Sequence, residues 1–292
     1  MTSFGMIFQP TFPPEQLRDT AVAVERAGID ELWMFEDCFK QSGLASLLGA
    51  VSATERIRVG VGVLPMPLRN VAVTAMELAT IERMFPGRAR FGVGHGVLDW
   101  MGQVGARVAS PLTLMREYVP ALRALLAGER LNVDGRYVHL DEVQLEWPPP
   151  GPVPVLAAGE GPKTIALVGE VADGLVMTTG SSPEMVRTAV DGIRRARADA
   201  GLPEAFEVVV FLMAEFGPGA AERIEREFDD WQLSGERRFA ATGSDEAVES
   251  MVRQMYAAGA TTVLLQSRAH EPDLPGYTAA VARIAERLRA DR

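Results

Sequence analysis

The sequence has a single cysteine, Cys38, among its 292 residues. One cysteine cannot form a disulfide within the chain, and it excludes a metal site built from several thiolates. Long hydrophobic runs are also missing: no stretch reaches about 18 consecutive apolar residues, which argues against a transmembrane helix. The amino terminus, MTSFGMIFQP, lacks the basic segment and apolar run of a secretory signal peptide. We therefore expect a cytoplasmic protein with a reduced thiol.

Positive charge is scarce as well. Asp and Glu outnumber Lys and Arg by 39 to 29, which gives a formal net charge of −10. Proteins that bind nucleic acids obtain much of their affinity from clustered Lys and Arg that face phosphates. The charge balance therefore argues against nucleic acid as a partner.

What the sequence does contain is a repeated alternation of short β-branched runs and amphipathic helical stretches. Eight runs are typical of buried strands: Ser3–Phe8, Glu31–Phe35, Ile57–Leu64, Ala89–Gly94, Val153–Ala158, Gly174–Thr178, Phe206–Ala214 and Thr261–Gln266. Alternating strands and helices predict a parallel sheet with right-handed crossovers. Eight repeats in a chain of this length predict an α/β fold, a (β/α)8 TIM barrel, with residues 1–292 as a single domain.

The alternation breaks after the fourth strand. The next strand begins only at Val153, and the gap holds a helical stretch, Leu112–Ala127, and a small strand pair expected within Arg136–Leu145. A structureless loop of this length would count against the barrel. We therefore predict an insertion at the barrel mouth, over about residues 97–152.

The residues after each strand carry the functional information, because the active site of such a barrel lies at the carboxyl ends of its strands. Glu36 and Asp37 end the second strand, where they would be either a proton donor and base or ordinary solvated carboxylates. His95 follows the fourth strand and faces the expected pocket. His139 and His270 are expected to be structural, and no two histidines have metal-ligand spacing, so no metal site is predicted.

Two glycine-containing segments follow strands. AAGEGPKT, residues 157–164, combines two glycines with a helix start and Lys163, which favours phosphate binding. The alternative is an ordinary β–α turn in which glycine is needed for a positive φ. FGVGHG, residues 91–96, forms the end of the fourth strand and lacks Rossmann spacing, so we interpret its glycines as room for a planar ring.

Four segments together make the sequence resemble the luciferase-like monooxygenase superfamily over essentially its full length. They are GIDELWMFED (28–37), the stretch from RIRVGVGVLP to ARFGVGHG (56–96), PVPVLAAGEGPKTIALVGEVADGLVMTTG (152–180) and AGATTVLLQ (258–266). The resemblance implies a (β/α)8 barrel that binds FMN or the deazaflavin coenzyme F420. Members that use F420 transfer hydrides, whereas members that use reduced FMN activate oxygen; the branch most similar to this chain is F420-dependent.

The resemblance also implies where the cofactor binds. A non-proline cis peptide behind the ring would fall at Gly62–Val63, with Gly94 and His95 near the ring. The phosphate would be held by residues from two strand ends: Gly159, Gly161, Pro162, Lys163, Thr179, Gly180 and Ser181.

The chain departs from the F420-dependent sugar-phosphate dehydrogenases that it distantly resembles. Their second strand ends in Asp-His, whereas this one ends in Glu36–Asp37, and Val97 replaces their acid after the fourth strand. We therefore interpret the chain as an F420-dependent oxidoreductase acting on another organic substrate, with His95, Glu36 or Asp37 as catalytic residues. The alternatives are an FMN-dependent monooxygenase supplied by a separate flavin reductase, and a non-catalytic flavin-binding protein. The resemblance further implies a homodimer.

Overall fold

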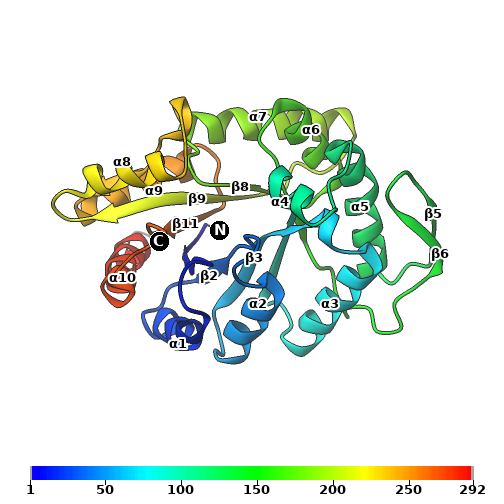
Figure 1. Ribbon diagram of the computed structural model, residues 1–292, viewed down its shortest axis with the longest axis horizontal. Coiled ribbons are helices and arrows are strands. Elements are labelled where there is room, and N and C mark those ends of the chain that lie inside the picture. Colours follow the sequence, from blue (N-terminus) through cyan, green and yellow to red (C-terminus); the bar gives the residue numbers. More distant parts are fainter. Residues whose placement is uncertain (1, 291–292) are drawn as a thin grey trace.

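The computed structural model describes residues 2–290, in which eight parallel strands close into a barrel inside a ring of helices (Figure 1). Around the barrel the strands are β1 (Ser3–Ile7), β2 (Glu31–Met34), β3 (Arg58–Pro65), β4 (Ala89–Gly94), β7 (Val155–Ala158), β8 (Gly174–Met177), β9 (Glu207–Phe216) and β11 (Thr262–Gln266). The barrel closes because β11 pairs with β1 and β8 pairs with β9. The eight predicted strands and the (β/α)8 fold class are confirmed.

Apolar side chains fill the barrel interior, as the period of two along each strand requires. Trp33 and Phe211 lie at its centre, together with Ile7, Leu156, Val176, Val209 and Leu264. At the amino-terminal end a polar network takes over. The buried Glu31 accepts a hydrogen bond of 2.6 Å from Ser3 and forms an ion pair of 2.6 Å with Arg58. These contacts fill the amino-terminal end of the barrel interior, whereas the carboxyl ends of the strands carry the loops that could bind a ligand.

The helices form the outer ring. They are α1 (Leu17–Arg26), α2 (Gly43–Ser52), α3 (Val71–Met84), α5 (Pro111–Leu126), α6 (Pro162–Val171), α7 (Pro183–Asp199), α9 (Asp245–Ala257) and α10 (Leu274–Ala290). The connections between strands and ring helices contain further short elements. They are the 3-10 turns η1 (Pro14–Gln16), η2 (Met66–Leu68) and η3 (Gly235–Arg237), the helix α8 (Ala220–Asp230) and the strand β10 (Ala241–Gly243). Among residues 2–290, none of the helices has the length and apolar character needed to span a membrane.

The segment over residues 97–152 consists of α4 (Leu98–Gln103), α5 and an antiparallel hairpin of β5 (Leu131–Asp134) and β6 (His139–Val143). Helix α5 packs against α3 and α6 as a regular member of the ring, and the hairpin lies outside it (Figure 1). The prediction that both strands of the hairpin lie within Arg136–Leu145 was wrong for the first strand. That strand ends before Gly135, and its side chains alternate between exposed and half-buried without a core face, which left little hydrophobic pattern to detect.

Candidate active site

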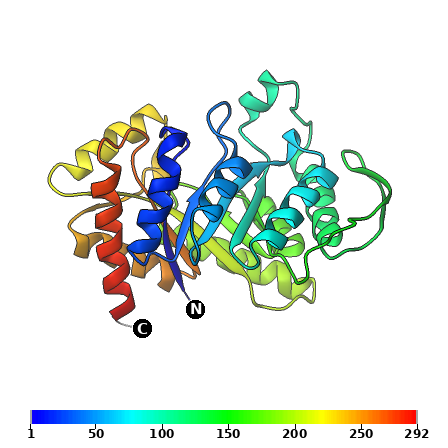
Figure 2. The same ribbon diagram turned by 90° about the horizontal axis from the view of Figure 1, so that it is seen from below.

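The carboxyl ends of the strands meet at one end of the barrel, the upper end in Figure 2. On the side of β2, β3, β4 and β7 this mouth is lined by apolar or small residues: Phe35, Val63, Gly94 and Ala158. On the side of β8, β11 and β1 it carries the buried polar side chains of Thr179, Gln266 and Gln9. The mouth therefore has one apolar half and one hydrogen-bonding half, which suits a planar ligand with one apolar and one polar edge.

Strand β3 is irregular where it reaches the mouth. The Gly62–Val63 peptide bond is cis, where the family resemblance placed one, and the pairing with β4 shifts between Val61 and Leu64. The side chain of Val63 lies against Gly94, because a Cβ on that glycine would be 2.6 Å from Val63 Cγ2. Residue 94 must therefore lack a side chain for Val63 to take this place. A second non-proline cis peptide, Cys38–Phe39, was not anticipated.

Glu36 is held firmly. Arg69 donates two hydrogen bonds of 2.6 and 2.7 Å to its two carboxylate oxygens, and the N–H of Gly43 donates a third of 2.7 Å. Both carboxylate oxygens of Glu36 are therefore occupied by donors from this chain. Glu36 therefore ties the end of β2 to η2 and to the start of α2, and its geometry is that of an anchor.

Asp37, the next residue, has a different environment. Burial raises the pKa of its carboxyl group, and the nearby ammonium group of Lys40, 3.2 Å away, offsets only part of that effect. A carboxyl group with a raised pKa keeps its proton to a higher pH than an exposed one, which makes Asp37 a candidate proton carrier.

His95 lies exposed at the end of β4. Its Nδ1 donates a hydrogen bond of 2.6 Å to the carbonyl of Gly96. The position is at the mouth, as the sequence indicated, and the exposed imidazole ring is accessible to a ligand.

The predicted phosphate loop follows β7, and Gly161 caps the amino terminus of α6. Neither Gly159 nor Gly161 has a positive φ, so the interpretation of these glycines as residues required by turn geometry is wrong. A Cβ on Gly159 would be 2.8 Å from Thr164 Cγ2, whereas one on Gly161 would meet no atom within 4 Å. The loop thus exposes backbone beside open space at a helix amino terminus, next to Lys163, which is an arrangement that attracts anions.

Arg237 joins this region from far along the chain. Its guanidinium group forms an ion pair with Glu160 and donates a hydrogen bond of 2.6 Å to the carbonyl of Thr179. Its backbone passes so close to Gly180, whose φ is +91°, that no side chain fits there. Burial alone would raise the pKa of Glu160, but the hydrogen bonds and charge of Arg237, helped by Thr178, lower it. Arg237 therefore holds an ionised carboxylate at the edge of the predicted phosphate site.

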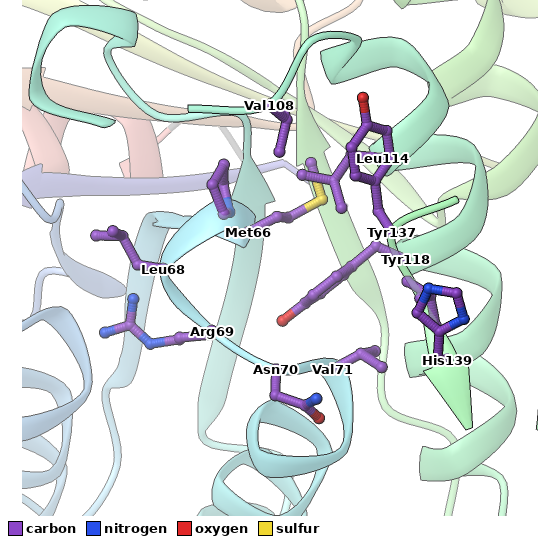
Figure 3. A pocket seen from close by; sticks show the side chains of 12 residues that line it. Met66, Leu68, Arg69, Asn70, Val71, Val108, Leu114, Tyr118, Tyr137 and His139 are labelled. Carbon is purple, nitrogen blue, oxygen red and sulfur yellow. The ribbon is translucent and has the colours of Figure 1, made fainter. Parts of the chain in front are cut away.

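A pocket of about 280 Å³ lies between η2, α5 and the tip of the β5–β6 hairpin (Figure 3). Its walls combine apolar side chains, such as Met66 and Leu114, with polar ones, and the ring of Tyr118 points into it (Figure 3). Burial raises the pKa of Tyr118 to about 12, although its hydrogen bond of 2.7 Å with Thr74 lowers it in part. The hydroxyl group therefore stays protonated near neutral pH.

The structure gathers the predicted residues of the second, third, fourth, fifth and sixth strand ends at one mouth. Sequence reasoning assigned no role to Arg69, although it lies in the segment after the third strand, and it missed Arg237. Arg237 is 58 residues from Thr179, and no motif surrounds it, so only tertiary structure brings the two together.

Comparison with known proteins gives a consistent result. A family model described as luciferase-like monooxygenase matches residues 2–291. Among curated relatives, 5,10-methylenetetrahydromethanopterin reductase of Methanolobus tindarius is 29% identical over 75% of this chain and 67% of its own length. F420-dependent glucose-6-phosphate dehydrogenase of Nakamurella multipartita is 32% identical over 63% of this chain and 60% of its own length, so this chain spans about two thirds of these relatives or less.

The fold also matches solved structures. An F420-dependent secondary alcohol dehydrogenase, solved in complex with an F420–acetone adduct, superposes with a TM-score of 0.86. The superposition covers 97% of this chain and 98% of the other at 20% sequence identity. At this identity the likeness concerns the fold, and it agrees with the closed barrel described above.

Proposed function

This chain belongs to the luciferase-like monooxygenase family, and from that premise we propose that it is an oxidoreductase that transfers a hydride between coenzyme F420 and a small organic substrate. One relative is named F420-dependent glucose-6-phosphate dehydrogenase and another 5,10-methylenetetrahydromethanopterin reductase. These names support a deazaflavin over FMN. The observation that carries the proposal is the mouth itself, where the floor of Val63 over Gly94 lies at the same end of the barrel as the open loop at Gly161.

The residues present fit such a cofactor. Gly62, Val63, Gly94 and His95 would line its ring, because the missing side chain of Gly94 leaves Val63 as a smooth apolar floor. The phosphate would be held by the second group: Gly159, Gly161, Pro162, Lys163, Thr179, Gly180 and Ser181. When bound, the deazaflavin ring accepts or supplies a hydride; orientation, exclusion of water and proton transfer are left to the protein.

We assign the proton to Asp37. Oxidation of an alcohol releases a hydride from carbon and a proton from the hydroxyl group, and the Asp37 carboxylate would take that proton. Reduction of a carbonyl group would use the protonated form, which burial favours. Glu36 would act as the anchor that fixes the loop, through Arg69.

Purified protein titrated with oxidised F420 and, in parallel, with FMN tests the cofactor through fluorescence. We expect micromolar or tighter binding of F420 and at least about tenfold weaker binding of FMN. The variant Lys163→Met should weaken F420 binding, whereas Arg194→Met, at the opposite end of the barrel, should not. Preference for FMN would support the alternative, a monooxygenase fed by a separate flavin reductase, which oxygen consumption with reduced FMN would then measure.

Tight F420 binding without any substrate-dependent change in F420 absorbance would favour the non-catalytic flavin-binding alternative. Failure to bind either cofactor would overturn the cofactor assignment.

We further propose that residues 1–292 act as one domain and form a homodimer. The first and last barrel strands pair with each other, which supports a single cooperative unit. The outer faces of α2 and α3 expose Leu48, Val73, Met76 and Met84, which supports burial against a second copy. Sedimentation should show a dimer, and Met76→Glu should shift it to monomer; an unchanged mass would remove this face from consideration.

A further inference from the structure

The pocket of about 280 Å³ in Figure 3 is lined by η2, the start of α3, α5 and the hairpin, and not by the barrel strands. The side chains of Met66, Leu114 and Tyr118 line it and are buried, as part of the core that surrounds the barrel. The hydroxyl group of Tyr118 is already paired with Thr74 at 2.7 Å, so Tyr118 presents its ring to the pocket. The floor of the pocket is therefore apolar and aromatic.

The rim of the pocket offers hydrogen-bond donors. Asn70 is exposed, and its Oδ1 accepts a hydrogen bond of 2.9 Å from the N–H of Ala72, which leaves the N–H groups of its amide as donors. The hydroxyl oxygen of Tyr137 accepts a hydrogen bond of 2.9 Å from the N–H of Ser110, which leaves its O–H as a donor. The rim therefore suits a ligand that carries an acceptor, such as a carbonyl oxygen.

The charges that line the pocket are balanced. Arg69 is the one Lys or Arg among the twelve lining residues, and both of its terminal nitrogens donate to Glu36. These twelve residues include no Asp or Glu. An anionic ligand needs a cation that is free to pair with it, and a cationic ligand needs a free carboxylate. The lining therefore favours an uncharged ligand.

The volume of the pocket sets the size of that ligand. An apolar cavity of about 150 Å³ is large enough to bind benzene. A pocket of about 280 Å³ therefore accommodates about two fused rings. A planar aromatic ligand also gains from edge or offset contact with the ring of Tyr118.

We propose that this pocket binds an uncharged, planar bicyclic molecule with a carbonyl oxygen at its edge. Its rings pack against Tyr118, and its carbonyl oxygen accepts hydrogen bonds from Asn70 and Tyr137. This site is separate from the barrel mouth and does not depend on the proposed function. Because Arg69 lines the pocket and holds Glu36, the bound molecule lies beside the anchor that precedes Asp37.

Calorimetric titration of the protein with three bicyclic probes tests the recognition. Coumarin is uncharged and carries a carbonyl oxygen at its edge, indole has an N–H group and no carbonyl, and 2-naphthoate adds a negative charge. We expect coumarin to bind with a Kd below about 1 mM. Indole and 2-naphthoate should bind about tenfold more weakly, because each hydrogen bond changes an equilibrium constant about twofold to tenfold.

Two variants test the place of binding. Val108→Trp should abolish coumarin binding, because Val108 is half-buried and lines the pocket, which a larger side chain would fill. Val104→Trp is its control, because Val104 is 46% exposed in the same segment and is not among the lining residues. Asn70→Asp keeps the cap of α3 but removes the amide donors, so coumarin should bind about threefold to tenfold more weakly. Gln254→Glu, exposed on α9, adds the same charge elsewhere and should have no effect.

Equal affinity for coumarin and indole would overturn recognition by the donors, and tighter binding of 2-naphthoate would overturn the uncharged class. Absence of coumarin binding, or binding unchanged in Val108→Trp and Asn70→Asp, would overturn the site. Thermal unfolding identifies a variant that fails to fold; if Val108→Trp fails, Asn70→Asp decides. These titrations contain no cofactor, so their outcome is independent of the F420 titration.

Discussion

Arg69 holds Glu36 through two parallel hydrogen bonds of 2.6 and 2.7 Å, and this pair joins the ends of β2 and β3 at the barrel mouth. The guanidinium and the carboxylate are both mostly buried, so water does little to replace the interaction. The pair fixes the backbone just before Asp37, to which we assign the proton under the proposed function, and it makes Glu36 an anchor.

Loss of the arginine should destabilise the protein. Arg69→Met leaves the Glu36 carboxylate in place without its partner, and we expect a loss of about 1.5–3 kcal/mol in the free energy of unfolding, measured with urea. Arg116→Met is the matched control, because Arg116 pairs with Glu170 on the surface and should contribute less than about 1 kcal/mol. The double variant Glu36→Gln, Arg69→Met should recover part of the loss; equal effects of the two arginine variants would contradict the anchor role.

The contact between Val63 and Gly94 predicts a second stability effect. Gly94→Ala places a Cβ 2.6 Å from Val63 Cγ2, and we expect a destabilisation of about 1–3 kcal/mol from overpacking. Gly102→Ala, in α4, is the control, because its Cβ would meet no atom within 4 Å. Adding Val63→Ala should restore stability to the first variant, as thermal unfolding would show. Persistent destabilisation in that double variant would mean that the backbone, and not Val63, sets the requirement for glycine.

The raised pKa of Asp37 predicts a pH dependence. Burial favours the protonated carboxyl group, and Lys40 opposes this only in part. Carbonyl reduction should therefore slow as pH rises through the folded-state pKa, and alcohol oxidation should speed up over the same interval. Asp37→Asn should remove this pH dependence from kcat/KM, while the Kd for F420 should change by no more than about threefold. If Asp37→Asn keeps the same pH dependence, another group carries the proton, and His95 is then the candidate.

The same shift also affects stability. Because the folded-state pKa lies above the unfolded-state value, ionisation of Asp37 costs more in the folded protein. Its contribution to stability is therefore present below the unfolded-state pKa and is lost as pH rises through the folded-state pKa. Urea unfolding at a series of pH values should show a smaller loss in Asp37→Asn than in the unaltered protein.

Glu160 should weaken the binding of an anionic ligand. Its lowered pKa keeps it ionised near neutral pH, and it occupies Arg237 at the edge of the phosphate loop. Glu160→Gln should therefore tighten F420 binding about twofold to fivefold at low salt, since more than half of the side chain is exposed and solvent screens the effect.

Arg237→Met should have the opposite effect and weaken F420 binding. Glu204→Gln, which removes an exposed carboxylate far from the mouth, is the control for a general charge effect. If Glu160→Gln and Glu204→Gln both bind F420 more tightly, the effect comes from net charge. If Glu160→Gln binds F420 more weakly, Glu160 supports the site.

The sequence by itself determined the barrel, because eight runs of buried residues alternate with helical stretches and each run is a local pattern. It also located the mouth, since the residues after parallel strands must gather at one end. The position of the Gly62–Val63 cis peptide came instead from the family resemblance, which adjacent residues carry.

Only the tertiary structure decided that Arg69 holds Glu36 as an anchor, whereas the neighbouring Asp37 pairs with Lys40. That difference depends on Arg69, which lies 33 residues from Glu36 in the sequence and meets it near two strand ends. The ion pair of Glu160 with Arg237 was hidden for the same reason. Side-chain pairing and burial depend on distances between remote segments, and these distances arise only when the barrel closes, so residue type and spacing along the chain do not reveal them.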